Sequence, residues 1–243
     1  MKLSILMPVY NEAATVQTMI DRVLKVQFPC EVELVIVDDC STDETAAILD
    51  QVEYPNVLKL RHARNQGKGG AIRTASNAAT GDYLIPCDAD LEYQPEEIPL
   101  LLDPVIRGDA DVVFGNRAFG SHTSYSYWYV IGNKGVTTAA NVLFNSYIGD
   151  LETCMKLLPT DLYRSLDIQE KGFGMEAEIT GKLLARGIRP FEVPISYQAR
   201  TREEGKKITW KDGVEAVWIL GKIRYKSRND AARKKPTGAR RAA

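Results

Sequence analysis

Apolar segments rich in β-branched residues alternate with amphipathic segments through the first half of the chain. Strands are predicted over 3–9, 32–39, 56–62, 82–88 and 110–116, and helices over 12–26, 43–53, 68–79 and 95–106. Strands that alternate with helices form βαβ units. We therefore expect an α/β fold in which a mostly parallel, Rossmann-like sheet is flanked by helices.

The second half of the chain has a less regular pattern. The spacing of apolar residues predicts helices over 134–147 and 174–186, and a strand is predicted over 188–197. No internal repeat and no linker interrupts these segments. We therefore expect the second half to complete the same domain as the first half.

The chain ends in a segment of different character. Trp210 and Trp218 recur at helical spacing within 208–228, which predicts a C-terminal amphipathic helix. The residues after this helix have almost no apolar bulk and cannot contribute to a core. We expect a single domain over 1–228 and a disordered basic tail over 229–243.

Charge is distributed unevenly along the chain. The net charge is −1, yet residues 221–243 hold nine Lys or Arg and one Asp, a local charge of +8, which leaves −9 for the first 220 residues. A helix with an apolar stripe and basic flanks can lie on an anionic membrane, and its tryptophans can equally pack against the sheet, so both alternatives stay open. A nucleic-acid partner is not expected, because the main domain is acidic.

Composition points to a globular protein in a reducing compartment. The 243 residues are 44% apolar and 26% charged, and the four cysteines show no Cys-x-x-Cys spacing. No segment reaches the roughly 18 consecutive apolar residues of a membrane span. The first residues lack the length and the cleavage site of a signal peptide. We expect a cytoplasmic protein, either soluble or peripheral at the inner face of the membrane.

Each predicted strand of the first half is followed by a loop with unusual polar residues or glycines. The loops are PVYNE (8–12), DDCSTD (38–43), RNQGKGG (64–70), DADLEY (88–93) and GNR (115–117). In open α/β sheets, ligands bind outside the carboxyl ends of the strands. We therefore expect these five loops to form one surface, which we call the rim.

The rim contains side chains suited to a phosphorylated ligand. Asp88, Asp90 and Glu92 lie in alternate positions after a buried strand, and their oxygens are ligands that Mg²⁺ or Mn²⁺ accepts. Such ions usually share their coordination with substrate phosphates. Asp39 can accept hydrogen bonds from a ribose or base, and Lys68 adds positive charge near the phosphates. The pattern predicts a metal and nucleotide site.

Two common nucleotide motifs are absent from the sequence. GKGG is not part of a G-x-x-x-x-G-K-[ST] loop, and no G-x-G-x-x-G follows the first predicted strand. ATP hydrolysis and nicotinamide chemistry therefore lose support.

The motifs PVYNE, VDDCSTDET, NQGKGGA, DADLEY and GNR, in this order, resemble those of the inverting family 2 glycosyltransferases with the GT-A fold. The later motifs DLETCMKLLP, GFGMEAEIT and VPISYQARTREEGKKI are similar to those of dolichol-phosphate mannose synthases and related polyprenyl-phosphate hexose synthases. The resemblance covers roughly residues 3 to 212. It implies the transfer of a hexosyl group, such as mannose or glucose, from a UDP- or GDP-hexose to a polyprenyl phosphate.

The resemblance also implies roles for individual residues. The nucleoside would be held by Pro8, Tyr10, Glu12 and Asp39, with Lys68 nearby. The metal would be held by Asp88 and Asp90, and Glu92 stands where related enzymes commonly have a Gln as third ligand. A phosphate would be gripped by Arg117, Arg202 and Lys207. The residues expected to act in the reaction are Asp90, Asp150, Glu176, Arg117 and Arg202.

The acceptor decides whether a general base is needed. A lipid phosphate is already ionised at neutral pH, whereas a hydroxyl acceptor on a glycan, cell-wall component or metabolite must lose a proton to a carboxylate. Asp150, Glu176 and Glu178 are the candidates for that base. DLETCMKL departs from the usual form of the mannose synthase motif, so both acceptors stay open. A nucleotide-sugar binding protein without turnover is a further alternative, which the two intact aspartates disfavour.

Overall fold

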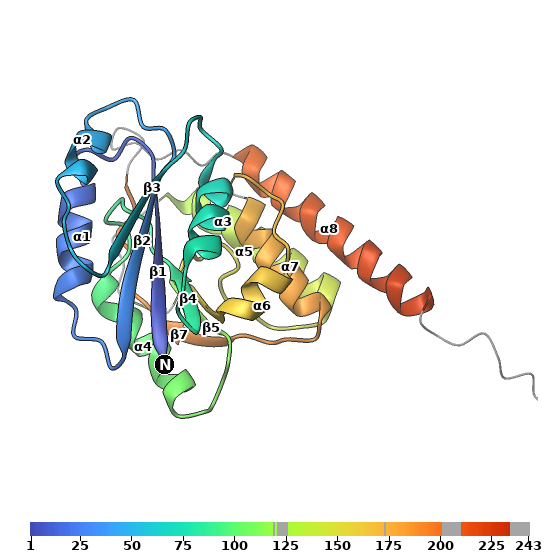
Figure 1. The fold of residues 1–243 in the computed structure, drawn as a ribbon. Helices are drawn as coiled ribbons and strands as arrows, with labels where there is room; N and C mark the ends of the chain where they lie inside the picture. Colours follow the sequence, from blue (N-terminus) through green and yellow to red (C-terminus); the bar gives the residue numbers. More distant parts are fainter. Residues whose placement is uncertain (119, 121–125, 173, 201–209, 234–243) are drawn as a thin grey trace, which may run out of the picture.

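The computed structural model describes residues 1–118, 120, 126–172, 174–200 and 210–233. The strands are β1 (Lys2–Val9), β2 (Glu31–Asp38), β3 (Val57–Arg61), β4 (Tyr83–Pro86), β5 (Val113–Asn116), β6 (Lys156–Pro159) and β7 (Phe191–Pro194). The helices are α1 (Val16–Lys25), α2 (Thr45–Asp50), α3 (Lys68–Ala78), α4 (Ile98–Ile106), α5 (Tyr127–Phe144), α6 (Thr160–Ser165), α7 (Gly174–Ala185) and α8 (Trp210–Arg233). A single 3₁₀ turn, η1 (Pro95–Glu97), leads into α4 (Figure 1).

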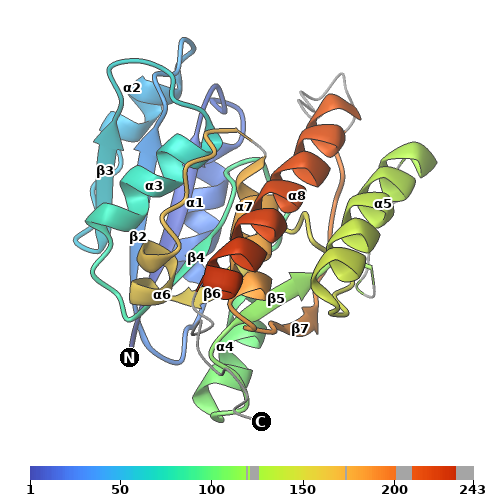
Figure 2. The same ribbon diagram turned by 90° about the vertical axis from the view of Figure 1, so that its right-hand side faces the viewer.

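The strands form one sheet in the order β3-β2-β1-β4-β6-β5-β7. β1 pairs in parallel with β2 and β4, β2 with β3, and β5 with β7, whereas β6 is antiparallel to both β4 and β5. Helices cover the sheet on both faces, with α1 on one side and α3 on the other (Figures 1 and 2). The expected α/β fold with a mostly parallel sheet is confirmed.

The antiparallel strand β6 and the short helix α6 that follows it are not predicted from the sequence. β6 is only four residues long, and it begins with a lysine and ends with a proline, so it offers no alternation of apolar and polar residues. Lys156 is nevertheless buried, because its ammonium donates to the backbone carbonyls of Leu151 and Thr153. Local backbone partners therefore allow a charged residue inside the sheet.

Helices α1 and α2 are shorter than expected, and α5 and α8 each extend beyond one end of the expected range. α5 begins at Tyr127, seven residues before the predicted start at 134. The sequence pattern missed these first turns because they carry exposed aromatic residues and no buried apolar stripe. α5 ends at Phe144, since Asn145 takes a left-handed conformation with φ of 49°. α8 continues to Arg233, so the first five residues of the expected tail are helical. Residues 234–243 lie outside the described part of the chain.

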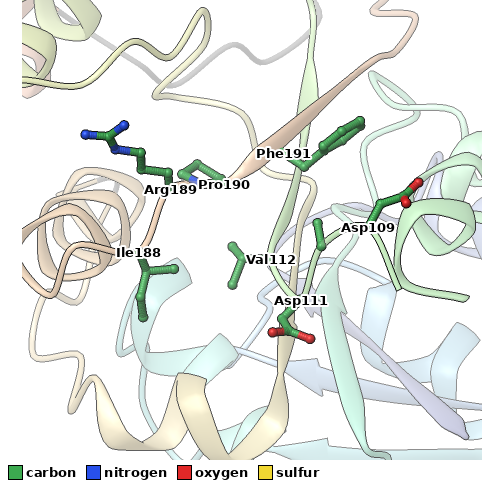
Figure 3. Close-up of a pocket in the computed structure, with 8 residues that line it drawn as sticks. Asp109, Asp111, Val112, Ile188, Arg189, Pro190 and Phe191 are labelled. Atoms are coloured by element: carbon green, nitrogen blue, oxygen red, sulfur yellow. The ribbon is translucent and has the colours of Figure 1, made fainter. Parts of the chain in front are cut away.

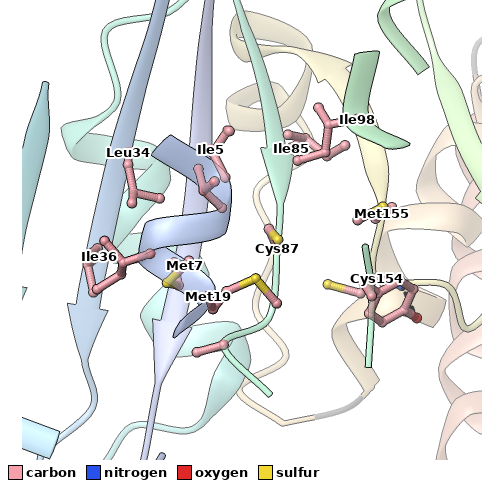
Figure 4. Close-up of a cluster of buried hydrophobic side chains, with 14 of the residues drawn as sticks. Ile5, Met7, Met19, Leu34, Ile36, Ile85, Cys87, Ile98, Cys154 and Met155 are labelled. Carbon is pink, nitrogen blue, oxygen red and sulfur yellow. Dashed lines mark hydrogen bonds between the residues drawn. The ribbon is translucent and has the colours of Figure 1, made fainter. Parts of the chain in front are cut away.

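The central strands are buried on both faces because the helices cover both sides of the sheet. Successive residues of a strand point to opposite faces. Ile5 therefore packs with Leu34 and Ile85 on the side of α1 and α4 (Figure 4). Leu6 packs on the other side, with α3 and α7. Each fully buried aliphatic side chain contributes roughly 1.5–3 kcal/mol, and the two layers hold the rim loops on a rigid base.

α8 packs against α7 and α5 and buries one of its faces there (Figure 2). Its other face leaves Trp210 and Trp218 exposed by 76% and 61%, and α5 likewise exposes Trp128 by 78%. The alternative in which the two α8 tryptophans pack against the sheet is therefore not what the structure shows. Among the described helices, none has the length and apolar character to cross a bilayer.

Candidate active site

The loops that follow β1 to β4 contact one another at one edge of the sheet. Hydrogen bonds join the loop after β1 to the loop after β2. The Gly67 N–H donates to Asp39 (2.7 Å), which joins the loops after β2 and β3. The Lys68 ammonium lies 2.7 Å from Asp88 and joins the loops after β3 and β4. Four of the five loops of the predicted rim thus form a continuous network.

Asp39 anchors the glycine-rich loop. Its buried carboxylate accepts hydrogen bonds from the backbone N–H groups of Gln66 (2.8 Å) and Gly67 (2.7 Å). The imidazole of His62 lies 2.6 Å from the same carboxylate. The expected contact of Asp39 with a nucleoside is a prediction that no contact in the structure tests. What the structure shows is that this carboxylate holds the glycine-rich loop in place.

The glycine-rich loop packs against the segment before α7. The Gly69 N–H donates to the carbonyl of Lys171 (2.7 Å). A Cβ at Gly67 or Gly69 would collide with the carbonyl oxygen of Lys171 or Glu170, and Gly67 also has a φ of +80°. Glycine is therefore required here by close backbone approach and by conformation. The contact brings the start of α7 to the rim.

Lys68 bridges two carboxylates at the first turn of α3. Its ammonium lies 2.7 Å from Asp88 and 2.9 Å from Glu176 on α7. Burial works against the charge of this lysine, but the two carboxylates outweigh it and hold the pKa of Lys68 well above its ordinary value. Lys68 is therefore a fixed cation between the β4 loop and α7.

Asp90 contacts an arginine that the sequence did not single out. Arg200 lies 3.0 Å from Asp90 and 3.1 Å from Glu12, so it spans the loops after β1 and β4. Burial and the nearby carboxylates of Asp88 and Glu92 raise the pKa of Asp90 above its ordinary value, although Arg200 acts in the opposite direction. A surplus of negative charge therefore remains at this point of the rim.

Glu92 does not join Asp88 and Asp90 as a third metal ligand in this geometry. Its carboxylate accepts hydrogen bonds from the hydroxyl of Tyr197 (2.6 Å) and from the backbone N–H of Arg200 (2.9 Å). In the described part of the chain, no group of three His, Cys, Asp or Glu side chains is arranged to hold a metal ion. The structure instead gives Glu92 the role of fastening the segment that carries Arg200.

Asp150 forms a closed ion pair with Arg117. Its oxygens accept from the Arg117 Nε (2.6 Å), Nη2 (2.8 Å) and backbone N (3.1 Å), and from the Asn133 amide (3.0 Å). Although burial acts in the opposite direction, Arg117 lowers the pKa of Asp150 to about 2. Glu192 on β7 accepts from the backbone N–H of Gly149 (2.8 Å) and holds the turn in place. Asp150 is therefore a poor base, and the charge of Arg117 is already neutralised by Asp150.

The carboxylates on α7 have different surroundings. Glu178 accepts from the backbone N–H groups of Gln169 (2.9 Å) and Glu170 (2.8 Å) and pairs with Lys182 at 2.6 Å, so it fastens the segment before the helix. Glu176 is 3% exposed and uses one oxygen for its ion pair, and its other oxygen has no hydrogen-bond partner among the described residues. Of these two base candidates, Glu176 alone keeps an oxygen for a ligand.

Glu152 is a second carboxylate with an oxygen that can still accept a hydrogen bond, and it was not among the residues predicted from the sequence. Its Oε1 atom is buried and has no hydrogen-bond partner within the described chain. Burial, and after it the charge of Glu176, raise the pKa of Glu152 above its ordinary value, although Lys156 acts in the opposite direction. The alternate spacing of Asp150 and Glu152, which repeats the Asp88–Asp90 pattern, was the available signal.

The remaining predicted residues fall into two groups. Pro8 lies in β1 and Tyr10 follows it, and both are half-buried at the start of the rim. Arg202 and Lys207 lie outside the described residues. Their expected contacts with donor or acceptor stay predictions.

A separate cavity lies at the opposite edge of the sheet. It has a volume of about 280 Å³ and is lined by residues before β5 and by residues before and at the start of β7, among them Asp111, Arg189 and Phe191 (Figure 3). Ligands of parallel α/β sheets bind at the carboxyl ends of the strands, which these residues do not reach. The cavity is therefore not part of the rim.

Comparisons with known proteins agree with this geometry. A family model described as glycosyl transferase family 2 matches residues 4–166. The chain is 29% identical over 205 residues to the low-salt glycan biosynthesis hexosyltransferase Agl6 of Haloferax volcanii, covering 83% of this chain and 49% of that protein. It is 26% identical over 212 residues to a dolichol-phosphate mannosyltransferase of Pyrococcus furiosus, covering 85% and 59%. The chain thus spans about half the length of these two relatives.

A relative of similar size and a solved structure extend the comparison. The chain is 28% identical over 218 residues to an undecaprenyl-phosphate mannosyltransferase of Micrococcus luteus, covering 85% of this chain and 87% of that protein. Glucosyl-3-phosphoglycerate synthase from Mycobacterium tuberculosis, solved with Mn²⁺, UDP and glucosyl-3-phosphoglycerate, superposes with a TM-score of 0.66 at 19% identity over 92% of this chain and 80% of that chain. The fold is therefore that of the GT-A glycosyltransferases.

Proposed function

The chain belongs to glycosyl transferase family 2, and on that premise we propose that it is an inverting hexosyltransferase that uses a nucleotide diphosphate sugar. The proposed acceptor is a polyprenyl phosphate, as in the names of the relatives from Pyrococcus and Micrococcus. The observation that carries the proposal is the cluster of Asp88 and Asp90 with Lys68 and Arg200 at the rim. Carboxylates and cations in one place are what a metal-bound pyrophosphate requires.

We propose Mg²⁺ or Mn²⁺ as the cofactor, held by Asp88 and Asp90. The donor set fits, because hard carboxylate oxygens suit these ions and the raised pKa of Asp90 reports a surplus of negative charge. Two carboxylates are also enough, since the donor phosphates and water complete the coordination. When bound, such an ion would stabilise the charge that develops on the departing nucleotide.

The residues of this chain then orient and release the donor. Pro8, Tyr10 and Glu12 border the place proposed for the nucleoside, beside the loop that Asp39 shapes. The Arg200 guanidinium, already shared between Glu12 and Asp90, supplies positive charge where the leaving pyrophosphate would lie.

Two of the three base candidates are unavailable to a hydroxyl acceptor, which favours a phosphate acceptor, whereas Glu176 keeps one oxygen without a partner among the described residues. Asp150 and Glu178 are both committed to other partners, and the first has a pKa lowered to about 2. A phosphate nucleophile is already ionised and needs no base, so positioning by cations is enough. The Lys68 ammonium, held between Asp88 and Glu176, is a cation that can position such a phosphate between the proposed donor and acceptor sides.

A hydroxyl acceptor is the second candidate, and Glu152 favours it. Its raised pKa and its unpartnered Oε1 are properties of a general base that works near neutral pH. Mass spectrometry of products formed from one donor with a polyprenyl phosphate or with sugar acceptors distinguishes the two. A glycosyl phosphate product supports the first proposal, and a glycoside formed without lipid phosphate contradicts it.

Donor and metal binding can be tested without knowing the acceptor. Thermal unfolding of the protein is measured with UDP- and GDP-hexoses, with and without Mn²⁺. We expect stabilisation that requires metal and nucleotide together, and Asp90→Asn should abolish it. Asp103→Asn removes an exposed carboxylate on α4 and is the matched control, which should respond as the wild type does. Equal stabilisation of both variants would contradict the proposal.

We also propose that the outer face of α5 and α8 lies on an anionic membrane. The helices pack side by side, and α5 has one Lys and no Asp or Glu over its whole length. Trp128, Trp210 and Trp218 are exposed on this face, and the chain beyond Gly221 is strongly basic. Aromatic and basic residues together are typical of an interfacial helix.

Flotation with phosphatidylglycerol vesicles tests the membrane proposal. We expect binding at low salt that falls at least fivefold in a Trp128→Ser, Trp218→Ser double variant, since each ring buries a large apolar area. Leu100→Ser removes an exposed apolar residue of α4 and serves as the control. If all three proteins float equally, this face does not contact the membrane.

A further inference from the structure

A groove lies between the C-terminal part of α5 and the second half of α8. Its volume is about 390 Å³, and it is lined by Leu143, Gly221, Arg224, Tyr225, Arg228 and Asn229. As far as the described residues go, this lining contains two arginines and no carboxylate. The groove lies on the outside of the helix pair, away from the rim contacts of α7.

Arg224 is oriented by a contact across the helix pair. Its guanidinium lies 5.8 Å from the centre of the Phe144 ring on α5, within the range of a cation–π interaction. The side chain is half-buried rather than free in solvent. Its planar N–H groups are therefore held at the groove before any ligand arrives.

Among the described residues, neither groove arginine has an acidic partner, whereas one lysine on α7 and one on α8 each have one. Lys182 pairs with Glu178 at 2.6 Å, and Lys222 lies 3.8 Å from Glu170. No ion pair of Arg224 or Arg228 is formed within the described part of the chain. The charges stand one turn apart on the same face of α8, an arrangement that costs stability unless an anion lies between them.

The helix dipole does not account for Arg224. α8 ends at Arg233, nine residues later, and the dipole acts within the last turn only. Two guanidinium groups, a tyrosine hydroxyl and an asparagine amide instead match the oxygens of a phosphate group, which arginine binds through paired N–H donors. We propose that this groove binds the phosphate group of an anionic ligand, from a lipid headgroup or from a free phosphate.

The position of the groove separates it from the transfer reaction. Arg224 lies fourteen residues after Trp210 on α8, roughly 21 Å along the helix axis from the end that faces the rim. A free phosphate as ligand does not depend on the proposed function, whereas a lipid headgroup as ligand rests on the membrane contact proposed above for α5 and α8. A variant that is defective in donor binding should still bind phosphate at the groove.

The experiment compares two double variants with the same change of charge. Arg224→Gln with Arg228→Gln removes both groove arginines, whereas Lys211→Gln with Lys226→Gln removes two α8 lysines outside the groove lining. Binding of inorganic phosphate is followed by NMR of the arginine Nε–H signals at constant ionic strength. Binding of phosphatidylglycerol vesicles is followed by flotation.

We expect the groove variant to lose about tenfold in affinity and the lysine variant less than about twofold, because paired charge-assisted hydrogen bonds are lost in the first case only. A difference seen with inorganic phosphate identifies a free phosphate as ligand, and a difference seen with vesicles alone identifies a headgroup. Equal losses in both variants, or no loss in either, overturn the proposal. Arg228→Gln alone, at an exposed position, should lower the affinity about threefold. This single variant provides the test if the double variant unfolds.

Discussion

Asp90 and Asp150 each contact an arginine, yet their pKa values move in opposite directions. Asp150 accepts four hydrogen bonds from Arg117 and Asn133, and its pKa falls to about 2. Among the described residues, Asp90 accepts from Arg200 and from the backbone N–H of Glu92 only, beside two further carboxylates, and its pKa rises. The number of donors and of like charges, rather than burial, decides the direction.

The difference separates a structural ion pair from a binding site. The Asp150 pair is complete in itself and leaves no charge for a ligand. The Asp90 cluster has negative charge that its own cations do not neutralise, which is the condition for binding a further cation. A carboxylate with a shifted pKa therefore indicates a binding site best when the cations around it do not neutralise its charge.

The largest expected effect is on transfer activity. Asp88→Asn and Asp90→Asn should each lower kcat/KM about a thousandfold, because removal of a metal-holding carboxylate costs several kcal/mol of transition-state stabilisation. Steady-state assays with nucleotide sugar and acceptor measure this loss. The folded state should be retained, since neither aspartate is saturated by protein donors. Activity within tenfold of the wild type would place the metal elsewhere.

The next effect is on folding stability. Arg117→Gln leaves Asp150 buried without its charge partner and should lower the free energy of unfolding by about 3–5 kcal/mol. Urea denaturation monitored by circular dichroism measures it. Arg22→Gln breaks the more exposed pair with Glu96 at 2.6 Å and should cost less than about 1 kcal/mol. Similar losses of stability in both variants would show that the buried Arg117–Asp150 pair contributes no more than an exposed ion pair.

A third effect concerns pH. Because the folded pKa of Asp150 is lowered to about 2, its contribution to stability is present above its ordinary pKa near 4 and is lost as the pH falls towards 2. This group should therefore remove about 2 kcal/mol of stability over that interval. Asp150→Asn should flatten the dependence, whereas Asp161→Asn, at an exposed position, should not. Unfolding curves at pH 6, 4 and 3 provide the measurement.

The smallest effect distinguishes Glu92 from the aspartates. Since Glu92 fastens the segment that carries Arg200, Glu92→Gln should keep Mn²⁺ affinity, measured with nucleotide present, within about threefold of the wild type. It should reduce thermal stability by about 1 kcal/mol through weaker hydrogen bonds to Tyr197 and Arg200. A loss of metal affinity as large as that of Asp90→Asn would restore Glu92 as a ligand.

The parts of the site that follow from strand order were predictable from the sequence. Asp39, Lys68, Asp88 and Asp90 each come directly after a strand or at the start of the next helix, and parallel strands bring such positions to one edge. The strands of the first half were found for the same reason, because buried parallel strands are continuous apolar runs. Local pattern and topology agree in this half of the chain.

The residues that the sequence missed depend on contacts between distant segments. Arg200 follows β7 by six residues, and contacts with Glu92 and Glu12 bring it back to Asp90. Glu152 precedes β6, a strand too short to give a periodic signal. No local pattern reports such placements, since they arise from packing across the sheet.

The reversed direction of β6 has a further consequence for how this protein can change. β5 ends at the rim and β6 begins there, so the intervening residues, with α5 among them, leave the sheet and return to it at the same edge. Exchanging that stretch for another of different length would leave every strand pairing intact. This stretch can thus change between homologous proteins while the loops after β1 to β4 stay as they are.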